Sequence, residues 1–356
     1  MKTKLFCVSA LALCVIVLVA CAAPTPTSAP VPPTPTVIPP TPNLAPNVNA
    51  ILTLTAPTAV SGARGALPQA TIRIGDLDRT YLYYVPANLP RNAPLLLAFH
   101  GSSMNAALMR TYTGYEFENL ADQNGFIVVY PNGYQNSWND CRKAATLPAK
   151  TQNIDDVGLV HALIAKFDGD YGINKSRVFA MGWSNGGYLT FRLASELPDE
   201  ITAIAAVSAN LPTDDNNDCR ALGKPIPVLI MNGTSDPLNP YNGGEQFVVG
   251  VSRGTVRSAQ ASAEYFAKLN GQTTPKTTRL PHKDPSDPTF VDRTIWNDAG
   301  KPEVVLYTIN GGGHVVPLGK FSASTVFMGV QLGQATGDLD APAEIWDFFA
   351  RQRPLK

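Results

Sequence analysis

The stretch VFAMGWSNGG, residues 178–187, carries the residue types best suited to chemistry in this chain. Ser184 stands between Gly182 and Gly186 in the pattern G-x-S-x-G. An apolar run typical of a buried strand precedes it, and helical spacing follows in YLTFRLASEL. A sharp strand-to-helix turn lifts the serine hydroxyl out of the backbone, and the glycines leave room for it. We therefore predict that Ser184 is a nucleophile; the competing interpretation is an ordinary glycine-rich turn.

A serine nucleophile needs a base within hydrogen-bond reach. The chain contains four histidines. His314 follows the apolar run EVVLYTIN and three glycines, at the sheet edge where sites collect, so we predict that it is the base. His100 ends another strand pattern but precedes Ser184, whereas His161 and His282 lie in patterns typical of solvated side chains.

The base in turn needs an acid that orients it. Asp236 ends PVLIMNGTSD, a strand pattern that runs into a turn, and we predict that it is this acid. Its competing role is that of a turn-capping residue. Asp214, Asp215 and Asp218 lie in the polar loop TDDNND, which is typical of a solvated turn.

Backbone N–H groups must also face the oxyanion that such a reaction develops. The N-terminus of the helix after Ser184 offers the N–H of Asn185. The second donor is expected from Gly101 or Ser102, in the loop after the strand pattern PLLLAFHG. A plain strand-to-loop turn is the alternative for this HGSS sequence.

The elements that must position these residues alternate between strands and helices. Strand patterns occupy residues 71–86 (two strands that turn near Gly75), 94–101, 126–133, 178–181, 201–210, 227–236 and 303–314, and helix patterns occupy 117–125, 155–171, 188–197, 257–269 and 342–352. Because most strands are apolar on both faces, we predict an α/β fold: a mostly parallel central sheet with helices on both faces.

The N-terminus shows a targeting pattern rather than a fold. Residues 1–20 combine a basic start with an apolar run, which predicts a signal peptide. The sequence LVAC then resembles a bacterial lipobox, so we expect cleavage before Cys21 and a lipid anchor on Cys21, at the cell surface or outside the cell. An ordinary signal peptide with an incidental cysteine is the alternative.

Residues 21–68 follow as a linker rich in proline and threonine, and 69–356 form one domain. Removal of Lys2 and Lys4 leaves 26 of the 28 basic residues against 28 acidic ones. This near-neutral balance predicts no nucleic-acid partner and no electrostatic membrane partner, so the membrane is reached through the anchor alone.

Two cysteines remain outside the signal and anchor, Cys141 and Cys219. An even pair in an oxidising compartment predicts one disulfide; two unrelated thiols are the alternative. The bridge is expected to join loops at the C-terminal ends of neighbouring parallel strands, and thereby to fix the loop of Trp138 beside Ser184. Cysteines without clustered histidines predict no metal site, and no nucleotide-binding fingerprint is present.

Seven motifs together resemble a known family: FIVVYPNG, SWNDC, DDVGLV, RVFAMGWSNGG, GTSDPLNPYNGG, GGGHVVP and AEIWDFF. The segment from about 70 to 350 is similar to the esterase/polyhydroxybutyrate depolymerase family of α/β-hydrolases, which includes feruloyl esterases and related lipoproteins. The resemblance implies an α/β-hydrolase fold, no cofactor, and cleavage of carboxylic esters in polymers or oligomers. By position, it implies Ser184 as nucleophile, Asp236 as acid and His314 as base, in the chain order of that fold.

Two positions depart from the family pattern. Ser102 stands where the family often has cysteine, and Val316 stands where it often has a tryptophan near the catalytic histidine. The loss of that aromatic wall bears on substrate preference. Trp138 and Trp183 are the candidates to line the cleft instead; ordinary packing is the alternative for each.

We therefore expect a monomeric serine esterase that acts on polyester or polysaccharide-linked esters. A non-catalytic surface-binding lipoprotein on the same scaffold is the alternative from another class of function, because one fold can serve proteins with unrelated functions. A peptidase is a third candidate, since the same three residues can cleave amides.

Overall fold

The computed structural model of the chain describes residues 65–220, 223–327 and 329–353, all within the compact unit Leu52–Lys356. Within these ranges, the largest sheet has the strand order β1-β2-β4-β3-β5-β6-β7-β12-β11-β10. The six central strands from β4 to β12 are parallel, and antiparallel pairs flank them at both edges. The predicted mostly parallel sheet is confirmed.

The strands of this sheet include every strand pattern seen in the sequence. Their bounds are β1 (Gln69–Ile74), β2 (Leu77–Tyr84), β3 (Leu95–Phe99), β4 (Ile127–Pro131), β5 (Val178–Trp183), β6 (Ala203–Val207), β7 (Val228–Gly233), β10 (Pro275–Arg279), β11 (Phe290–Trp296) and β12 (Val304–Asn310). Strands β10 and β11 were not predicted, because β10 is exposed along its whole length and lacks the apolar alternation that marks a strand.

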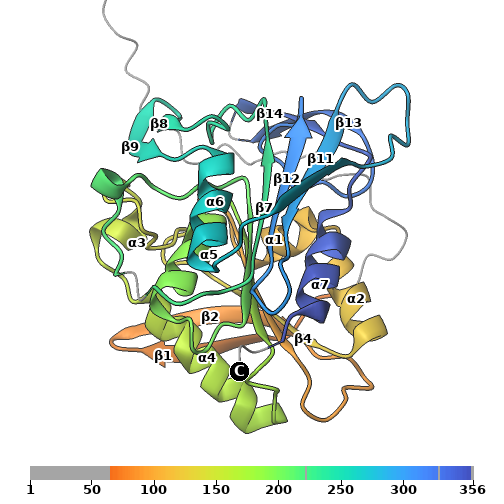
Figure 1. Cartoon of the computed structure of the whole chain (residues 1–356). Coiled ribbons are helices and arrows are strands. Elements are labelled where there is room, and N and C mark those ends of the chain that lie inside the picture. Colours follow the sequence, from red (N-terminus) through yellow and green to blue (C-terminus); the bar gives the residue numbers. More distant parts are fainter. Residues whose placement is uncertain (1–64, 221–222, 328, 354–356) are drawn as a thin grey trace, which may run out of the picture. The chain divides into compact units, whose positions relative to one another are not determined.

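Helices cover both faces of the sheet, as predicted (Figure 1). One face carries α4 (Asp156–Tyr171), α5 (Asn185–Glu196) and α6 (Ala259–Leu269); the other carries α1 (Ala106–Tyr112), α2 (Glu116–Asn124) and α7 (Ala341–Arg351). The short helices α3 (Pro148–Thr151) and η1 (Asp214–Asn216) lie in loops. Each predicted helix is present, with ends within three residues of the expected ones.

The central strands separate two hydrophobic cores because successive side chains of a strand point to opposite faces. In β3, Leu95, Leu97 and Phe99 belong to the core beneath α4, α5 and α6. Leu96 and Ala98 belong to the core beneath α1, α2 and α7. The continuous apolar runs noted in the sequence therefore reflect strands that are buried on both sides.

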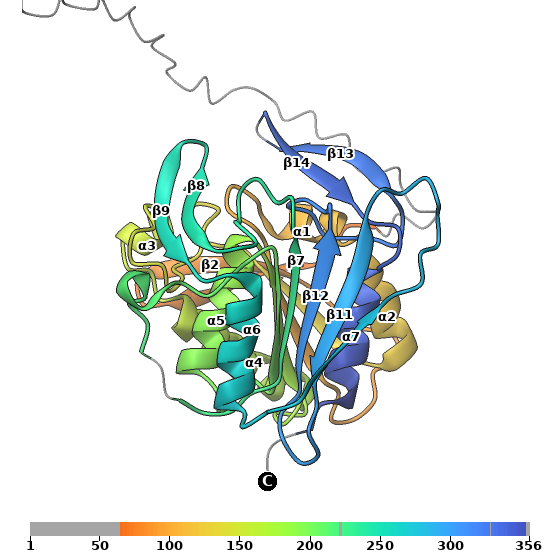
Figure 2. The same cartoon turned by 45° about the horizontal axis from the view of Figure 1, so that its top comes forward.

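Two hairpins outside the main sheet stand at the end toward which the parallel strands point (Figure 2). One is β8 (Gly244–Val248) with β9 (Val251–Val256), and the other is β13 (Ser322–Phe327) with β14 (Val330–Ala335). The parallel strands direct their C-terminal loops to this same end, where ligand sites of open α/β sheets form. Among the described residues, no helix combines the length and apolarity needed to cross a membrane.

Candidate active site

Ser184 occupies a sharp turn between β5 and α5. Its backbone angles are φ 55° and ψ −120°, in a region that a residue with a side chain rarely adopts. A Cβ atom added to Gly182 would lie 2.1 Å from the carbonyl oxygen of Gly186, and one added to Gly186 would lie 2.2 Å from that of Phe99. Both glycines of G-x-S-x-G are therefore required for the turn.

Asp236 and His314 meet through a short hydrogen bond. The Nδ1 atom of His314 lies 2.7 Å from the Oδ2 atom of Asp236, and both side chains are buried. The other oxygen of Asp236 accepts hydrogen bonds from the backbone N–H groups of Leu238 and Asn239, at 2.8 Å each. A carboxylate can only accept, so Nδ1 of His314 donates and its Nε2 atom keeps a free lone pair. The loops after β7 and β12 thus join an oriented imidazole to a fixed acid.

Ser184 and His314 line one cavity of about 310 Å³. Of the residues predicted from the sequence, it also includes Gly101, Ser102, Asn185 and Trp183. The remaining lining residues come from three loops and the two hairpins: Ser103, Met104, Arg142, Leu147, Leu238, Gln246, Val248, Val249, Val251, Arg253, Phe327 and Val330. Within the described ranges, no group of three or more His, Cys, Asp or Glu residues is placed to hold a metal ion.

The loop after β3 approaches Ser184 closely. A Cβ atom on Gly101 would lie 3.4 Å from Cβ of Ser184. His100 fixes this loop from behind: its Nε2 accepts the backbone N–H of Gly133 at 2.9 Å, so its Nδ1 donates to the carbonyl oxygen of Gly101 at 2.7 Å. His100 is therefore not a second base but a buried residue that positions Gly101. Sequence reasoning saw His100 only as a neighbour of the site.

His100 must stay neutral to serve in this way. Burial of the ring lowers the pKa of His100 to about 4 from its ordinary 6.5, and the nearby charge of Arg79 acts in the same direction. The unfolded chain therefore binds this proton more readily than the folded chain between those two values. The stability that neutral His100 contributes is complete above pH 6.5 and is lost as the pH falls toward 4.

We expect acidification from pH 7.5 to pH 5 to lower the free energy of unfolding by about 2 kcal/mol through His100 alone. Urea unfolding followed by tryptophan fluorescence at the two pH values measures the loss. His100→Gln should remove this component of the loss, whereas the exposed control His161→Gln should retain it. An equal loss in the wild type and in His100→Gln would contradict the prediction.

Asn185, the first residue of α5, clamps the loop that carries Trp138. Its Oδ1 accepts the backbone N–H of Trp138 at 2.8 Å, and its Nδ2 donates to Oδ2 of Asp140 at 2.7 Å. Trp138 itself is 0% exposed, and its indole N–H donates to the carbonyl oxygen of His100 at 2.8 Å. The expectation that Trp138 lines the cleft is wrong: its ring supports the loop after β3 from within the core.

Trp183 does line the cavity, immediately before Ser184. Its ring stacks on Tyr112 with centroids 5.0 Å apart and lies 5.6 Å from the ring of His314. Its indole nitrogen is buried without a hydrogen-bond partner among the described residues. Trp183 thus supplies an aromatic wall on the side of the cavity where His314 lies.

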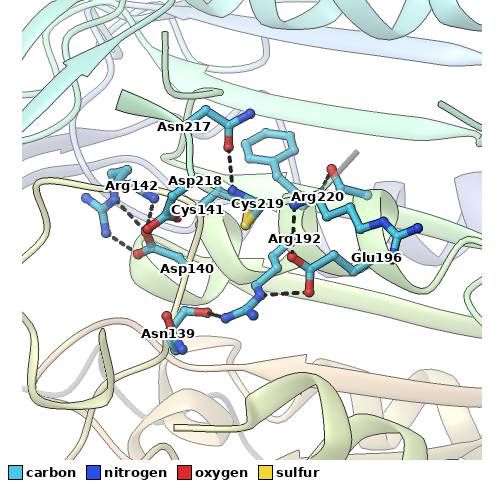
Figure 3. The surroundings of a disulfide bond; sticks show 12 residues. Asn139, Asp140, Cys141, Arg142, Arg192, Glu196, Asn217, Asp218, Cys219 and Arg220 are labelled. Atoms are coloured by element: carbon cyan, nitrogen blue, oxygen red, sulfur yellow. Dashed lines mark hydrogen bonds and ion pairs between the residues drawn. A yellow bond between two sulfur atoms is a disulfide. The ribbon is translucent and has the colours of Figure 1, made fainter. Parts of the chain in front are cut away.

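The predicted disulfide joins Cys141 and Cys219, with Cα atoms 5.0 Å apart (Figure 3). The expectation that the bridge joins the loops of neighbouring strands is wrong. The two loops follow β4 and β6, and strands β3 and β5 lie between these in the sheet. In Figure 3 the ion pair of Asp140 and Arg142 flanks the disulfide on one side, and that of Arg192 and Glu196 flanks it on the other. The bridge therefore fixes a charged network near the cavity rather than an aromatic wall.

Arg142, Gln246 and Arg253 are cavity residues that sequence reasoning missed. Arg142 directly follows Cys141, and that position beside a predicted bridge was the available signal. Its guanidinium pairs with Asp140 at 2.5 Å, donates to Oε1 of Gln246 at 2.5 Å, and lies 3.7 Å from the ring centre of Tyr188. Gln246 and Arg253 come from the β8–β9 hairpin, which no sequence pattern indicated. Cys21 lies outside the described residues.

Comparisons with known proteins identify relatives of this chain. A family model described as Phospholipase/Carboxylesterase matches residues 127–253. A protein of Aspergillus flavus named "Probable feruloyl esterase C" is 32% identical over 208 residues, which cover 55% of this chain and 71% of that protein. Feruloyl esterase B of Piromyces equi is 29% identical over 64% of this chain, although the match spans only 40% of its own length.

Among solved structures, the acetyl xylan esterase from Aspergillus awamori matches 71% of this chain and 95% of its own, with a TM-score of 0.48 and 20% identity. On the sequence relationship, the chain belongs to the esterase family of α/β-hydrolases that includes these feruloyl esterases, and it is a carboxylic-ester hydrolase.

Proposed function

We propose that the chain is a serine esterase in which Ser184, His314 and Asp236 act as a catalytic triad. The observation that carries this proposal is the hydrogen bond of 2.7 Å between Asp236 and His314, beside a cavity that His314 shares with the strained Ser184. This arrangement has the parts that acyl transfer requires: a nucleophile, a base with a free lone pair, and an acid that orients the base.

In the first half of the reaction, Oγ of Ser184 attacks the ester carbonyl carbon while Nε2 of His314 takes the hydroxyl proton. Asp236 stabilises the imidazolium that results, and the backbone N–H groups of Asn185 and of Gly101 or Ser102 stabilise the oxyanion. The C–O bond to the alcohol then breaks, and His314 returns the proton to the leaving oxygen. Water repeats these steps on the acyl-enzyme, which releases the acid and restores Ser184.

For the substrate, we propose acyl groups esterified to plant polysaccharide, feruloyl groups foremost. The names of the matched relatives support this class. The cavity supports it as well, because Trp183 and the valines of the β8–β9 hairpin give it an apolar wall suited to an aromatic acyl group. Hydroxybutyrate polyester is the second candidate, on the sequence resemblance of the chain.

A substrate panel tests this proposal. The purified protein is expected to release ferulate from methyl ferulate and from feruloylated arabinoxylan faster than it releases acetate from acetylated xylan or hydroxybutyrate from polyhydroxybutyrate. Hydrolysis of the polyester alone would overturn the polysaccharide class and leave the esterase chemistry intact. No turnover of any ester in the panel would count against the whole proposal.

We also propose that the mature protein is held outside the cell by a lipid on Cys21, with residues 21–68 as a linker to the catalytic domain 69–356. The apolar segment before Cys21 supports this, and so does the disulfide, which is typical of an oxidising compartment. The intact mass of membrane-extracted protein tests it: a mature chain that begins at another residue or carries no lipid would refute the anchor.

A further inference from the structure

The cavity beside Ser184 is lined by two arginines and, among the described residues, by no carboxylate. The two arginines differ in how their charge is balanced. Arg142 is buried in a two-point ion pair with Asp140, at 3.1 Å and 2.5 Å. Its charge is therefore already compensated, and its third nitrogen, Nη1, donates to Gln246. Arg142 thus stabilises the folded chain and is not available to pair with a charged ligand.

Arg253 has no such partner. It lies on β9 and is half-buried, and its guanidinium donates a hydrogen bond to the hydroxyl group of Thr146. Within the described ranges no aspartate or glutamate forms an ion pair with it, whereas Arg257, four residues later, pairs with Asp214 at 2.6 Å. Burial lowers the pKa of Arg253, the positive charge of Arg142 lowers it further, and the carboxylate of Asp140 opposes this in part. An anion bound in the cavity would offset both the burial of the Arg253 charge and its repulsion from Arg142.

The surroundings of Arg253 strengthen its attraction for an anion. Val248, Val249 and Val251 of the same hairpin line the cavity beside it. Val249 and Val251 remain 64% and 45% exposed, so the gain of a charge pair here over one at the open surface comes from the partial burial of the Arg253 guanidinium itself. The planar guanidinium also matches a carboxylate with two parallel hydrogen bonds, which a neutral ester group cannot provide.

We propose that Arg253 binds a free carboxylate of the substrate, so that, for a given acyl group, the site prefers an ester that carries a carboxylate in addition to the ester bond that is cleaved. This inference rests on the proposed function, because it assumes that the ester reacts at Ser184. The carboxylate has two possible sources: the acid end of a hydroxy-acid oligoester, or a uronic acid in an acylated polysaccharide. Arg253 recognises the chemistry that the two share.

Matched substrate pairs test the role of Arg253. The first pair is 4-nitrophenyl hydrogen adipate and its neutral carboxamide analogue, which differ only in the charge at the far end of the acyl chain. In Arg253→Gln, the ratio of kcat/KM for the carboxylate over the carboxamide is expected to fall at least about tenfold, chiefly through KM. Arg253→Lys should retain part of the ratio, because it keeps the charge but loses the two-point geometry.

Arg257→Gln is the matched control, since it removes a positive charge from the same segment but not from the cavity lining. It should leave the ratio unchanged. An unchanged ratio in Arg253→Gln, or an equal fall in Arg257→Gln, would overturn the inference. Ser184→Ala separates the two proposals: if this variant still cleaves the esters, the proposed function fails, whereas an inactive Ser184→Ala with a ratio insensitive to Arg253 refutes only the carboxylate site.

Two further substrate pairs distinguish the sources of the carboxylate. They are 3-acetoxybutyrate against its amide, and an O-acetylated methyl glucuronoside against the O-acetylated methyl glucoside, each followed by acetate release. Preference for the charged member of one pair identifies the source, and preference for neither contradicts the proposal. If Arg253→Gln does not fold, inhibition of the wild-type protein tests the carboxylate site instead. Hexanoate should inhibit at least about tenfold more strongly than hexanamide. Equal inhibition would refute the site.

Discussion

Ser184→Ala is expected to lower kcat on 4-nitrophenyl acetate by at least about 10⁴-fold. The substitution removes the oxygen that forms the acyl-enzyme, while the groups expected to stabilise the oxyanion and bind the substrate stay in place. Those groups alone still accelerate hydrolysis over water, so a small residual rate is consistent with the proposal. Steady-state kinetics with nitrophenolate release measures the loss, and circular dichroism verifies that the variant is folded.

Ser195→Ala is the matched control for this experiment. Ser195 lies on the same helix α5, where its hydroxyl donates to the carbonyl oxygen of Phe191 at 2.9 Å, and it does not line the cavity. This variant should keep wild-type activity and should still react with a fluorophosphonate probe, which labels activated serines. If Ser184→Ala retains turnover, or is still labelled, another residue is the nucleophile.

The positions of the three proposed catalytic residues could be predicted from the sequence because each follows a strand buried on both faces. A continuous apolar run marks such a strand without reference to the rest of the fold. The runs before Ser184, Asp236 and His314 became β5, β7 and β12, whose C-terminal ends lie at one edge of the sheet. Parallel strands deliver their following loops to that edge, which is why residues distant in sequence meet there.

The walls of the cavity could not be predicted in the same way. The β8–β9 and β13–β14 hairpins are only partly buried, and glycines interrupt them at Gly254 and Gly333. Neither segment has the strict apolar alternation that marks a strand. Their places depend on contacts with distant parts of the chain, such as the backbone hydrogen bonds from His314 to Leu332 and from Thr213 to Thr255. Arg253 was missed for this reason.

The role of Trp138 shows a second limit of sequence reasoning. An aromatic residue in a loop near the site suggested a substrate wall, but nothing in the local sequence indicates which way its ring points. Asn185 holds the backbone of Trp138, and His100 accepts its indole N–H, so the ring lies within the core. These partners are 47 and 38 residues away in the sequence, and only the folded chain brings them together.

The disulfide gives the second large effect that we expect. Replacement of both Cys141 and Cys219 by serine should lower the free energy of unfolding by about 4 kcal/mol, because the bridge closes a loop of 78 residues and restricts the unfolded chain. The pair of substitutions avoids a reactive single thiol. Urea unfolding of the variant and of the wild type, each with and without reductant, measures the effect.

Contacts that do not need the disulfide still join the two loops in the folded state. The backbone N–H of Asp218 donates to the carbonyl oxygen of Cys141 at 3.2 Å, and that of Lys143 donates to Asn216 at 2.7 Å. We therefore expect the serine variant to fold and to cleave 4-nitrophenyl acetate. Its kcat/KM for methyl ferulate should fall further, because the cavity residue Arg142 directly follows Cys141 and loses part of its support.

Reduced wild type is the matched control for the serine variant, since it breaks the same bond without changing another atom. The two should unfold at the same urea concentration, and reductant should not alter the variant. A wild type that is insensitive to reductant, or a variant within about 1 kcal/mol of the oxidised wild type, would mean that the noncovalent contacts already restrict the chain. The loop-closure argument would then be wrong for this protein, while a selective loss on methyl ferulate would still place the bridge in support of the cavity wall.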